Sequence, residues 1–580
     1  MINITNNLQT LIGKKNFNRF KLIAFLNFST FVFELISLGS LPIFIASLIN
    51  ENETYNKLSL IFGKNFDLIL GNSNLPFVLG IIVISSFLIK NLILMALILF
   101  QGNYFKKLKV ELTNKIFDFY SQSNFLILNK RNPSLTVRNI TNEIQNLLPY
   151  LTHFLNLIKE ISAVLVIFFL LVYFEPISTL IISSLFLLIS LLYVYILKPL
   201  INKKSVQNQN FRNEFIKIVY ETFGSIKDIK VMNKEFEIAK FFQKKLIRYE
   251  DNLYIFFFLE RAPRFILEIL AVFIISALSI FYLSYSKDNI SNLPSLSLFV
   301  VGAVRFLPAF SAITLSRYYL RLFNPSLNVL NDEFKLIGGF SYGEKFESKI
   351  KKNAILVDNS FKIELRDVSF QYPGDEKYLL KNLNFNINFK DKIGITGPSG
   401  GGKSTLFDIL LGLIEPKEGK VLINNLNLNQ NIKAYREKVG FVSQNLFIQD
   451  STLKENIAFN FDNQKIDDKK INQAIEISGL DNLLKKSSKG INEKVGSNGL
   501  RLSGGERQRL ALARAIYTEP EIFFLDEFTS SLDIEKEKEI FEKIFDHFRD
   551  KTFVIIAHRE SALKYCNKRF ILEEGQLREN

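Results

Sequence analysis

The chain has 580 residues, which is too long for one ordinary domain and predicts several domain-sized units. It is 48% hydrophobic, with 57 Phe and no Trp, yet 22% of its residues are charged, a mixture typical of a chain that is partly membrane-embedded. The single cysteine, Cys566, excludes an intramolecular disulfide and a cysteine-based metal cluster. The net charge of +15 fits either nucleic-acid binding or basic loops beside anionic lipid, so the positions of the basic residues must decide.

Long apolar segments occupy the first part of the chain. Each is long enough, at about 1.5 Å per residue, to cross a hydrocarbon core of about 30 Å. So many apolar segments in series are hard to bury inside a soluble protein, and the first lacks the cleavage site of a signal peptide. We therefore predict six transmembrane helices at about 22–49, 76–100, 154–174, 177–197, 255–283 and 295–318.

Basic residues are concentrated before the first apolar segment and in the two long connections, 101–153 and 198–254. The connections 50–75 and 284–294 carry fewer. By the positive-inside rule, both termini and the long connections lie in the cytoplasm, and we expect those connections to extend the helices below the membrane. The positive charge therefore indicates topology, and no nucleic-acid partner is expected.

The pattern changes after residue 335. Residues 1–335 form the predicted all-α transmembrane domain, and a glycine-containing linker covers 336–360. In 361–580, short β-branched and aromatic strands alternate with helical stretches, which predicts an α/β domain.

The soluble half contains a phosphate-binding loop. The stretch "KIGITGPSGGGKSTLFDILLG", 392–412, is typical of a strand, a glycine loop and a helix, and it satisfies G-x-x-x-x-G-K-[ST]. Glycines let backbone N–H groups surround phosphates, Lys403 reaches the β- and γ-phosphates, and the Ser404 hydroxyl holds Mg²⁺. The predicted nucleotide-binding residues here are Gly397, Pro398, Ser399, Gly400, Gly401, Gly402, Lys403, Ser404 and Thr405.

Further polar residues follow predicted strands. "EIFFLDEF" ends in Asp526, placed to bind Mg²⁺, and Glu527, placed to orient or deprotonate the attacking water. "KTFVIIAHRE" delivers His558 to the sheet edge, where a γ-phosphate sensor is needed. Gln444 follows another strand and can coordinate Mg²⁺ or water, and Tyr372 offers a ring for adenine stacking or packs as a core tyrosine.

A second glycine pair stands in "RLSGGERQRLALARA", 501–515. Ser503 and Glu506 ahead of an apolar-periodic helix predict a capping box. A cap does not require Gly504 and Gly505, which bare the helix N-terminus so that an anion can approach. No lysine follows, so this stretch is interpreted as a second face of a shared nucleotide site.

These motifs, in this order and spacing across about 220 residues, resemble the ATP-binding cassette family, and the six-segment half resembles exporter-type half-transporters. The resemblance implies an ATPase with ATP and Mg²⁺, working as a homodimer. In it, ATP at Lys403 of one copy is covered by Ser503 and Gly505 of the other, with Asp533 along the seam. It also implies a bacterial inner membrane protein with its ATP-binding domain in the cytoplasm. Two departures are Glu506, where Gln is more usual, and "EKVGSNG", 493–499, which lacks an acidic residue after Val-Gly.

Charged residues inside the predicted spans are candidates for substrate contact because they are costly in a membrane. The candidates are Glu34, Arg261, Arg264 and Arg305, with Glu268 nearby. Arginine suits bidentate phosphate contact, so a cavity with Arg264 and Arg305 would hold an anionic headgroup. Mutual ion pairing or snorkelling is the structural alternative.

The segments around these residues, "FELISLGSLPIF", "APRFILE" and "AVRFLP", resemble the PglK-type lipid-linked oligosaccharide flippases of bacterial protein glycosylation. The substrate implied is a polyprenyl pyrophosphate glycan, moved from the inner to the outer leaflet. Alternatives are a general lipid or multidrug exporter, a peptide exporter, and an ATP-gated channel or regulatory subunit without pumping. The apolar segments exclude a soluble DNA-associated ATPase.

Overall fold

A computed structural model gives the fold of the chain. It describes residues 2–62, 74–123, 125–129, 131, 133–174, 214–285, 293–339 and 361–580, the last without 445, 461–465, 497–501, 530–532 and 558. Between 175 and 213 it describes only residues 176, 179, 180, 184, 195, 199, 207, 210 and 211. The chain divides into two compact units, Met1–Gln122 with Arg131–Gly343, and Ser123–Lys130 with Glu344–Asn580.

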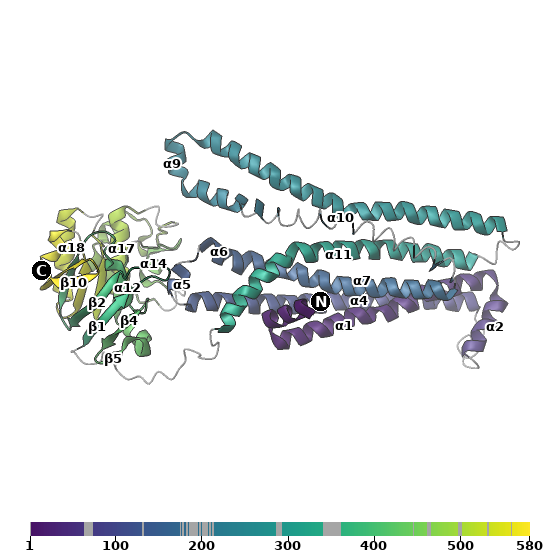
Figure 1. Ribbon diagram of the computed structural model, residues 1–580, viewed down its shortest axis with the longest axis horizontal. Helices are drawn as coiled ribbons and strands as arrows, with labels where there is room; N and C mark the ends of the chain where they lie inside the picture. Colours follow the sequence, from purple (N-terminus) through teal and green to yellow (C-terminus); the bar gives the residue numbers. More distant parts are fainter. Residues whose placement is uncertain are drawn as a thin grey trace. The chain divides into compact units, whose positions relative to one another are not determined.

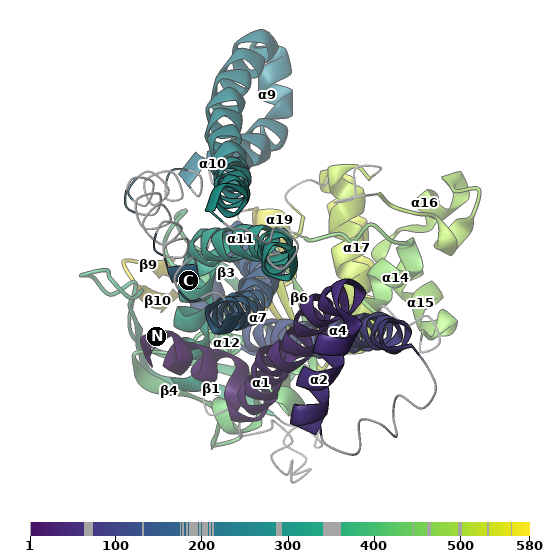
Figure 2. The same ribbon diagram turned by 90° about the vertical axis from the view of Figure 1, so that its right-hand side faces the viewer.

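The described residues of the first unit form helices joined by short turns, as the apolar segments predicted. Its elements are α1 (Ile2–Ile49), α2 (Glu51–Phe62), α4 (Leu75–Gln122), α6 (Pro133–Arg138), the π-helical turn η1 (Asn139–Glu143), α7 (Ile144–Phe174), α9 (Ile226–Val231), α10 (Glu235–Tyr285) and α11 (Leu293–Gly339). Helices α1, α4, α7 and α11 pack side by side as a bundle, and α10 contacts α11 (Figure 1; Figure 2). Helix α11 ends within the stretch predicted as a linker.

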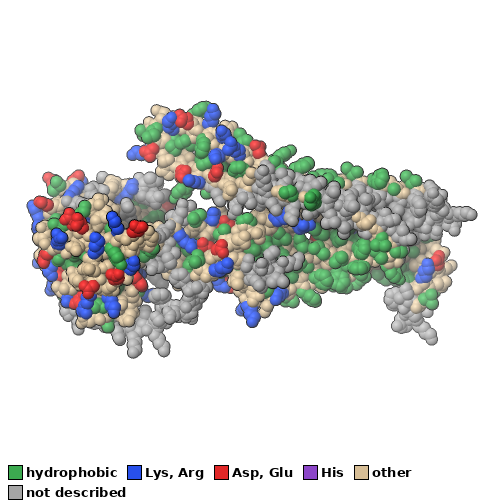
Figure 3. All heavy atoms as spheres, viewed as in Figure 1, with side chains coloured by type: hydrophobic (Ala, Val, Ile, Leu, Met, Phe, Trp, Pro, Cys, Tyr) green, Lys and Arg blue, Asp and Glu red, His purple; other side chains and the backbone are tan. Residues whose placement is uncertain are grey.

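The long helices carry the apolar surface that a bilayer requires. Among the described residues, three helical stretches are long and apolar enough to cross a membrane: Leu8–Ile49, Leu75–Gln122 and Leu135–Tyr173. They contain the predicted spans 22–49 and 76–100 and all of 154–174 except its last residue. The span 177–197 lies largely outside the described residues, while 255–283 and 295–318 lie in α10 and α11. Where its side chains are described, the right-hand part of the bundle in Figure 3 is covered by hydrophobic side chains, and charged side chains gather around α2, around α9 and at the left-hand end of the bundle.

The second unit is the α/β domain. It comprises α5 (Phe125–Asn129), β1 (Lys362–Phe370), β2 (Leu380–Asn388), β3 (Lys392–Thr396), α12 (Lys403–Leu410), β4 (Glu418–Ile423), β5 (Leu426–Asn427), η2 (Leu428–Asn431), α13 (Ile432–Arg436), β6 (Val439–Val442), α14 (Leu453–Ala458), α15 (Asp468–Ser478), α16 (Asp481–Lys486), η4 (Gly490–Asn492), α17 (Gly504–Tyr517), β7 (Ile522–Asp526), α18 (Ile534–His547), β8 (Thr552–Ile556), α19 (Glu560–Leu563), β9 (Lys568–Glu573) and β10 (Gln576–Glu579). A helical membrane domain is thus followed by an α/β domain, which confirms the predicted fold class.

Two sheets organise this domain within the described residues. One is antiparallel in the order β2-β1-β4-β5, and the other has the order β10-β9-β3-β8-β7-β6. In the second sheet β9, β3, β8, β7 and β6 run parallel, so their carboxyl ends meet at one edge. Ligands bind at this edge in open α/β sheets.

The core explains why the central strands are apolar at every position. In β7, Phe523 and Leu525 face one hydrophobic cluster, whereas Ile522 and Phe524 face the other. A parallel strand covered on both faces cannot alternate apolar with polar residues, since successive side chains point to opposite faces. This burial holds Asp526, the next residue, at the edge of the sheet.

Helix α5 belongs to the second unit although it lies in the sequence predicted as part of the membrane domain. Its residue Leu126 packs against the cluster formed by β1, β2, β3 and α12. The helix has only 5 residues, which is too short a pattern to recognise from the sequence.

Candidate functional site

The glycine loop connects β3 to α12, as predicted. Gly397 has a φ of 148°, and a Cβ there would lie 2.2 Å from the carbonyl oxygen of Leu572. Gly402 caps α12 in the left-handed conformation, with a φ of 96°. A side chain at either position would be strained or would clash, so both positions require glycine.

Lys403 begins α12 and is buried. Its Nζ donates to the carbonyl oxygens of Gly397 and Pro398, each at 2.9 Å. The ammonium group is therefore held above the loop, where the exposed N–H groups of a helix N-terminus favour an anion.

Ser404 lies beside a carboxylate from another strand. Its Oγ donates to Oδ2 of Asp526 at 3.3 Å. One turn further along α12, burial and the neighbouring Asp526 carboxylate raise the pKa of Asp408 to about 6. A cation bound between Ser404 and Asp526 would relieve this crowding of negative charge.

Glu527 follows β7 directly and has a strained backbone. Its φ is 48°, a left-handed conformation that a non-glycine residue seldom adopts, and its N–H donates to the carbonyl of Ile556 at 3.1 Å. Nε2 of Gln444 donates to Oε2 of Glu527 at 2.7 Å. The strained turn thus points the carboxylate toward the residue that follows β6.

The predicted polar residues therefore meet at one edge of the parallel sheet. The phosphate loop follows β3, Gln444 follows β6, and Asp526 and Glu527 end β7. His558 follows β8 but lies outside the described residues. In the part of the chain that is described, no group of three or more His, Cys, Asp and Glu side chains could hold a metal by itself. The oxygens of Ser404, Gln444 and Asp526 fit Mg²⁺, which is usually bound by a few protein oxygens together with substrate phosphates.

Tyr372 packs against the domain. Its ring meets Phe370 edge to face at 5.0 Å, and its hydroxyl lies 3.0 Å from Oγ1 of Thr405. These contacts fit the alternative in which Tyr372 packs as a core tyrosine. The Tyr372 hydroxyl also reaches the helix that begins at the phosphate loop.

Ser503 and Glu506, on either side of the second glycine pair, form the predicted capping box. Oγ of Ser503 accepts from the N–H of Glu506 at 3.3 Å, and Oε2 of Glu506 accepts from the N–H of Ser503 at 2.7 Å. Glutamate therefore caps as predicted. Gly504 and Gly505 form the first turn of α17. Asp533 stands exposed at the start of α18, where Lys536 approaches it at 3.1 Å.

A buried carboxylate that the sequence analysis missed lies behind this site. Glu537 in α18 is 0% exposed; Oγ1 of Thr529 donates to it at 3.0 Å, and Nη1 of Arg559 lies 3.3 Å away. Thr529 lies two residues after Glu527, and Arg559 directly follows His558. The sequence does hold a signal that Glu537 is buried, because it shares one face of α18 with Ile540, Phe541, Ile544 and Phe545.

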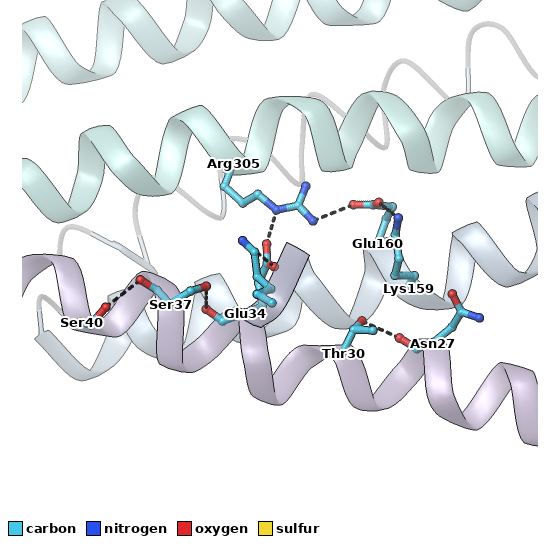
Figure 4. Close-up of polar contacts among 9 residues, drawn as sticks. Asn27, Thr30, Glu34, Ser37, Ser40, Lys159, Glu160 and Arg305 are labelled. Carbon is cyan, nitrogen blue, oxygen red and sulfur yellow. Dashed lines mark hydrogen bonds and ion pairs between the residues drawn. The ribbon is translucent and has the colours of Figure 1, made fainter. Parts of the chain in front are cut away.

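In the membrane unit, Arg305 lies between two glutamates. Its Nε pairs with Glu34 of α1, and its Nη2 lies 3.3 Å from Glu160 of α7 (Figure 4). Lys90 of α4 lies 3.4 Å from Glu34, and Lys159 lies 3.0 Å from Glu160. The result is a chain of alternating charge across four helices. Arg305 and Glu34 therefore pair with each other in this structure, as the structural alternative to substrate contact predicted.

Of the other membrane candidates, the structure describes only the side chain of Glu268, which is not part of this series of charges. The side chains of Arg261 and Arg264 lie outside the described residues, and Glu268 is exposed on α10. Glu160, Lys90 and Lys159 were not among the predicted candidates, although each is a charged residue in or beside an apolar segment.

Two family models match the chain. The ABC transporter transmembrane region matches residues 41–306, and the ABC transporter model matches 380–530. The chain belongs to the ABC transporter family. With one membrane region and one ATP-binding domain it has the organisation of an exporter half-transporter, and such half-transporters generally dimerise.

Curated relatives agree with this assignment over parts of their length. ABC transporter B family member 29 of Arabidopsis thaliana, a chloroplastic protein, is 33% identical over 310 residues, covering 50% of this chain and 48% of the relative. The mitochondrial iron-sulfur clusters transporter ATM1 of Candida glabrata is 35% identical over 246 residues, covering 40% and 33%. This ABC transporter chain thus spans less than half the length of these relatives.

A solved structure shows that the fold is shared along the chain. A bacterial Atm1-family ABC exporter with ATP bound matches with a TM-score of 0.66 at 17% identity, covering 97% of this chain and 94% of that one. At this identity the similarity concerns the fold alone.

Proposed function

We propose that this ABC transporter chain hydrolyses ATP to move an amphiphile with an anionic headgroup across a membrane. The observation that carries the ATPase part is the meeting of the phosphate loop, Ser404 with Asp526, and Gln444 with Glu527 at one sheet edge. Each pair joins residues far apart in the sequence, and each supplies the oxygens that phosphoryl transfer to water requires.

In the proposed reaction, the loop 397–402 and Lys403 hold the phosphates of ATP. Glu527 orients the attacking water and accepts its proton, and His558 contacts the γ-phosphate. Ser404, Gln444 and Asp526 would hold Mg²⁺, which neutralises charge developing on the phosphate oxygens. The contacts of Tyr372 are those of a packed core tyrosine, and stacking of its ring on adenine is a further proposal.

We propose that two copies of the chain share each ATP. The N-terminus of α17 is suited to an anion, yet the lysine that a phosphate loop needs is absent after Gly505. The anion would instead be the ATP bound to the phosphate loop of a second copy. This ATP would be covered by Ser503, Gly504, Gly505 and Glu506, with Asp533 at the seam between the copies. Self-pairing is the simpler arrangement because one chain carries a complete set of motifs.

Helix α5 is proposed to transmit the ATP-driven movement. It belongs to the ATP-binding unit, whereas the helices on both sides of it in the sequence belong to the membrane unit. A displacement of the ATP-binding unit therefore acts directly on α4 and α6.

For the substrate, we propose a lipid-linked oligosaccharide moved from the inner to the outer leaflet of a bacterial inner membrane, with both termini in the cytoplasm. The proposal rests on the sequence patches around Glu34, Arg264 and Arg305. In this scheme the pyrophosphate competes with Glu34 and Glu160 for Arg305, whose planar guanidinium suits either partner. Arg261 and Arg264 would contact the same headgroup. A general lipid or multidrug exporter is the second candidate, because the ABC multidrug transporter MDR5 of Trichophyton rubrum is also 36% identical to this chain over 222 residues.

The test is reconstitution of the purified chain in liposomes with fluorescent lipid-linked oligosaccharide, phospholipid or a hydrophobic drug. ATP-dependent flipping should favour the oligosaccharide, Glu527→Gln should abolish it, and Arg305→Ala should reduce it at least tenfold. Equal transport of all three amphiphiles would replace the proposal by a general exporter. Nucleotide binding without hydrolysis would remove the ATPase part and favour a gating module.

A further inference from the structure

A cavity of about 400 Å³ lies where α1 is kinked, at the end of the bundle that carries the basic residues. The kink is at Gly13, whose φ of 78° and ψ of 153° interrupt the helical path. A Cβ on Gly13 would meet nothing within 4 Å, so the backbone itself borders open space. The cavity is lined by Ile12, Gly13, Lys14, Lys15, Asn16, Arg19, Glu111 and Lys115.

The cavity has an excess of positive charge. Its carboxylate, Glu111, is already engaged: Lys115 Nζ donates to Oε1 at 2.7 Å and Asn16 Nδ2 donates to Oε2 at 2.8 Å. Among the described residues Lys14, Lys15 and Arg19 form no salt bridge, although Lys15 also interacts electrostatically with Glu111. Cations that outnumber the carboxylates around a cavity attract a further anion.

The floor of the cavity is fixed by buried groups. Asn16 is 8% exposed, and its carbonyl accepts from the buried hydroxyl of Tyr104 on α4 at 3.0 Å. Its side chain also donates to the carbonyl of Ile12 at 3.1 Å. These bonds hold the kink of α1 against α4. The backbone around the cavity is therefore ordered before a ligand binds, which lowers the entropy lost on binding.

The position along the helix indicates which anion fits. Exposed apolar side chains begin at Leu22 and Phe25 on α1, and Arg19 lies about one turn before Leu22, about 4.5 Å along the axis. The headgroup layer of a bilayer extends about 5–7 Å beyond the hydrocarbon on each side. Arg19 therefore lies at the depth of lipid phosphates, with Lys14 and Lys15 about 6–8 Å further from the hydrocarbon, and acyl chains can continue along Leu22, Phe25 and Phe28.

We propose that this cavity binds the phosphate of an anionic phospholipid headgroup in the cytoplasmic leaflet, separately from transport of the substrate. Basic pockets beside membrane helices bind such headgroups through the same charge and depth. A soluble phosphate has the same charge, but it gains nothing from the apolar surface that begins at Leu22.

The test uses the full chain in neutral detergent, with phosphatidylglycerol or phosphatidylcholine added. Retained lipid is counted by native mass spectrometry, and the rise in melting temperature is followed. The variant Lys14→Gln, Lys15→Gln, Arg19→Gln should bind phosphatidylglycerol at least tenfold more weakly. Its matched control, Lys106→Gln, Lys107→Gln, Lys109→Gln, removes the same charge from exposed residues of α4 that do not line the cavity. The control should bind like the wild type.

A second variant changes the affinity in the opposite direction. Glu111→Gln removes the negative charge facing the cavity and should strengthen phosphatidylglycerol binding severalfold, which guards against a folding defect in the triple variant. Equal losses in both triple variants, or undiminished binding in the cavity variant, would overturn the proposal. Inorganic phosphate or glycerol phosphate giving the same rise in melting temperature would identify a soluble anion instead.

Discussion

Replacing Arg559 with alanine should destabilise the ATP-binding domain more than replacing its partner Glu537. Glu537 is 0% exposed and would keep Thr529 as its side-chain partner among the described residues, whereas Arg559 is 42% exposed and can hydrate. Leaving a buried carboxylate without its cation costs about 3–5 kcal/mol, and the exposure of Arg559 places this case near the lower end. Glu537→Gln keeps an acceptor for Thr529 and should cost about 1 kcal/mol.

The double variant gives the decisive comparison. Once Arg559 is alanine, Glu537→Gln removes the orphaned charge, so the double variant should be more stable than Arg559→Ala alone. The assay is thermal unfolding of the full chain in detergent at a fixed scan rate, where about 1 kcal/mol corresponds to about 2–4 °C for a domain of this size. We expect a fall on the order of 10 °C for Arg559→Ala and about 3 °C for Glu537→Gln.

A matched control comes from the same helix. Glu539 pairs with Lys543 at 2.9 Å on an exposed face, so Glu539→Gln should change stability by less than about 0.5 kcal/mol. If the losses of stability caused by Arg559→Ala and by Glu537→Gln simply added in the double variant, the account of Glu537 as a buried charge that needs Arg559 would be refuted.

Three further outcomes are expected. Ser503→Arg should leave ATP binding at Lys403 intact and abolish hydrolysis, as measured by nucleotide binding and phosphate release; normal hydrolysis would contradict a shared site. Burial and Asp526 raise the pKa of Asp408 from 3.8 to about 6. The ionised carboxylate therefore destabilises the folded protein above pH 6, and this destabilisation disappears as the pH falls toward 4. Asp408→Asn should therefore raise the melting temperature at pH 7.5 but not near pH 4, measured without nucleotide in EDTA, and a pH-independent gain would argue against it. Burial raises the pKa of Cys566 to about 11, so iodoacetamide at pH 8 should label the folded chain far more slowly than the unfolded chain, and labelling at equal rates would be inconsistent with this environment.

The nucleotide-site geometry was largely predictable because its information is local. A phosphate loop needs glycine at Gly397 and Gly402, and a capping box needs Ser503 three residues before Glu506. Parallel strands then bring Asp526 and Gln444 to the same edge, so a sequence reader who recognises the strands obtains the clustering as well.

Contacts between distant elements were not predictable in this way. Arg305 and Glu34 are separated by 271 residues, and nothing in either neighbourhood specifies the other as its partner. Whether Arg305 faces a cavity or a carboxylate depends on the rotation of four helices about their axes. The same applies to Glu537, because its partners come from two loops that only the folded sheet brings together.

The position of Lys403 has a consequence for how ATP-binding variants are interpreted. The lysine is a structural part of its own loop, since its Nζ joins the carbonyls of Gly397 and Pro398. Substituting Lys403 with an apolar residue therefore removes two loop-closing bonds together with the phosphate-binding charge. Such a variant reports on loop shape as well as on affinity, and Lys403→Arg, which keeps the charge but changes the reach, is needed to separate the two effects.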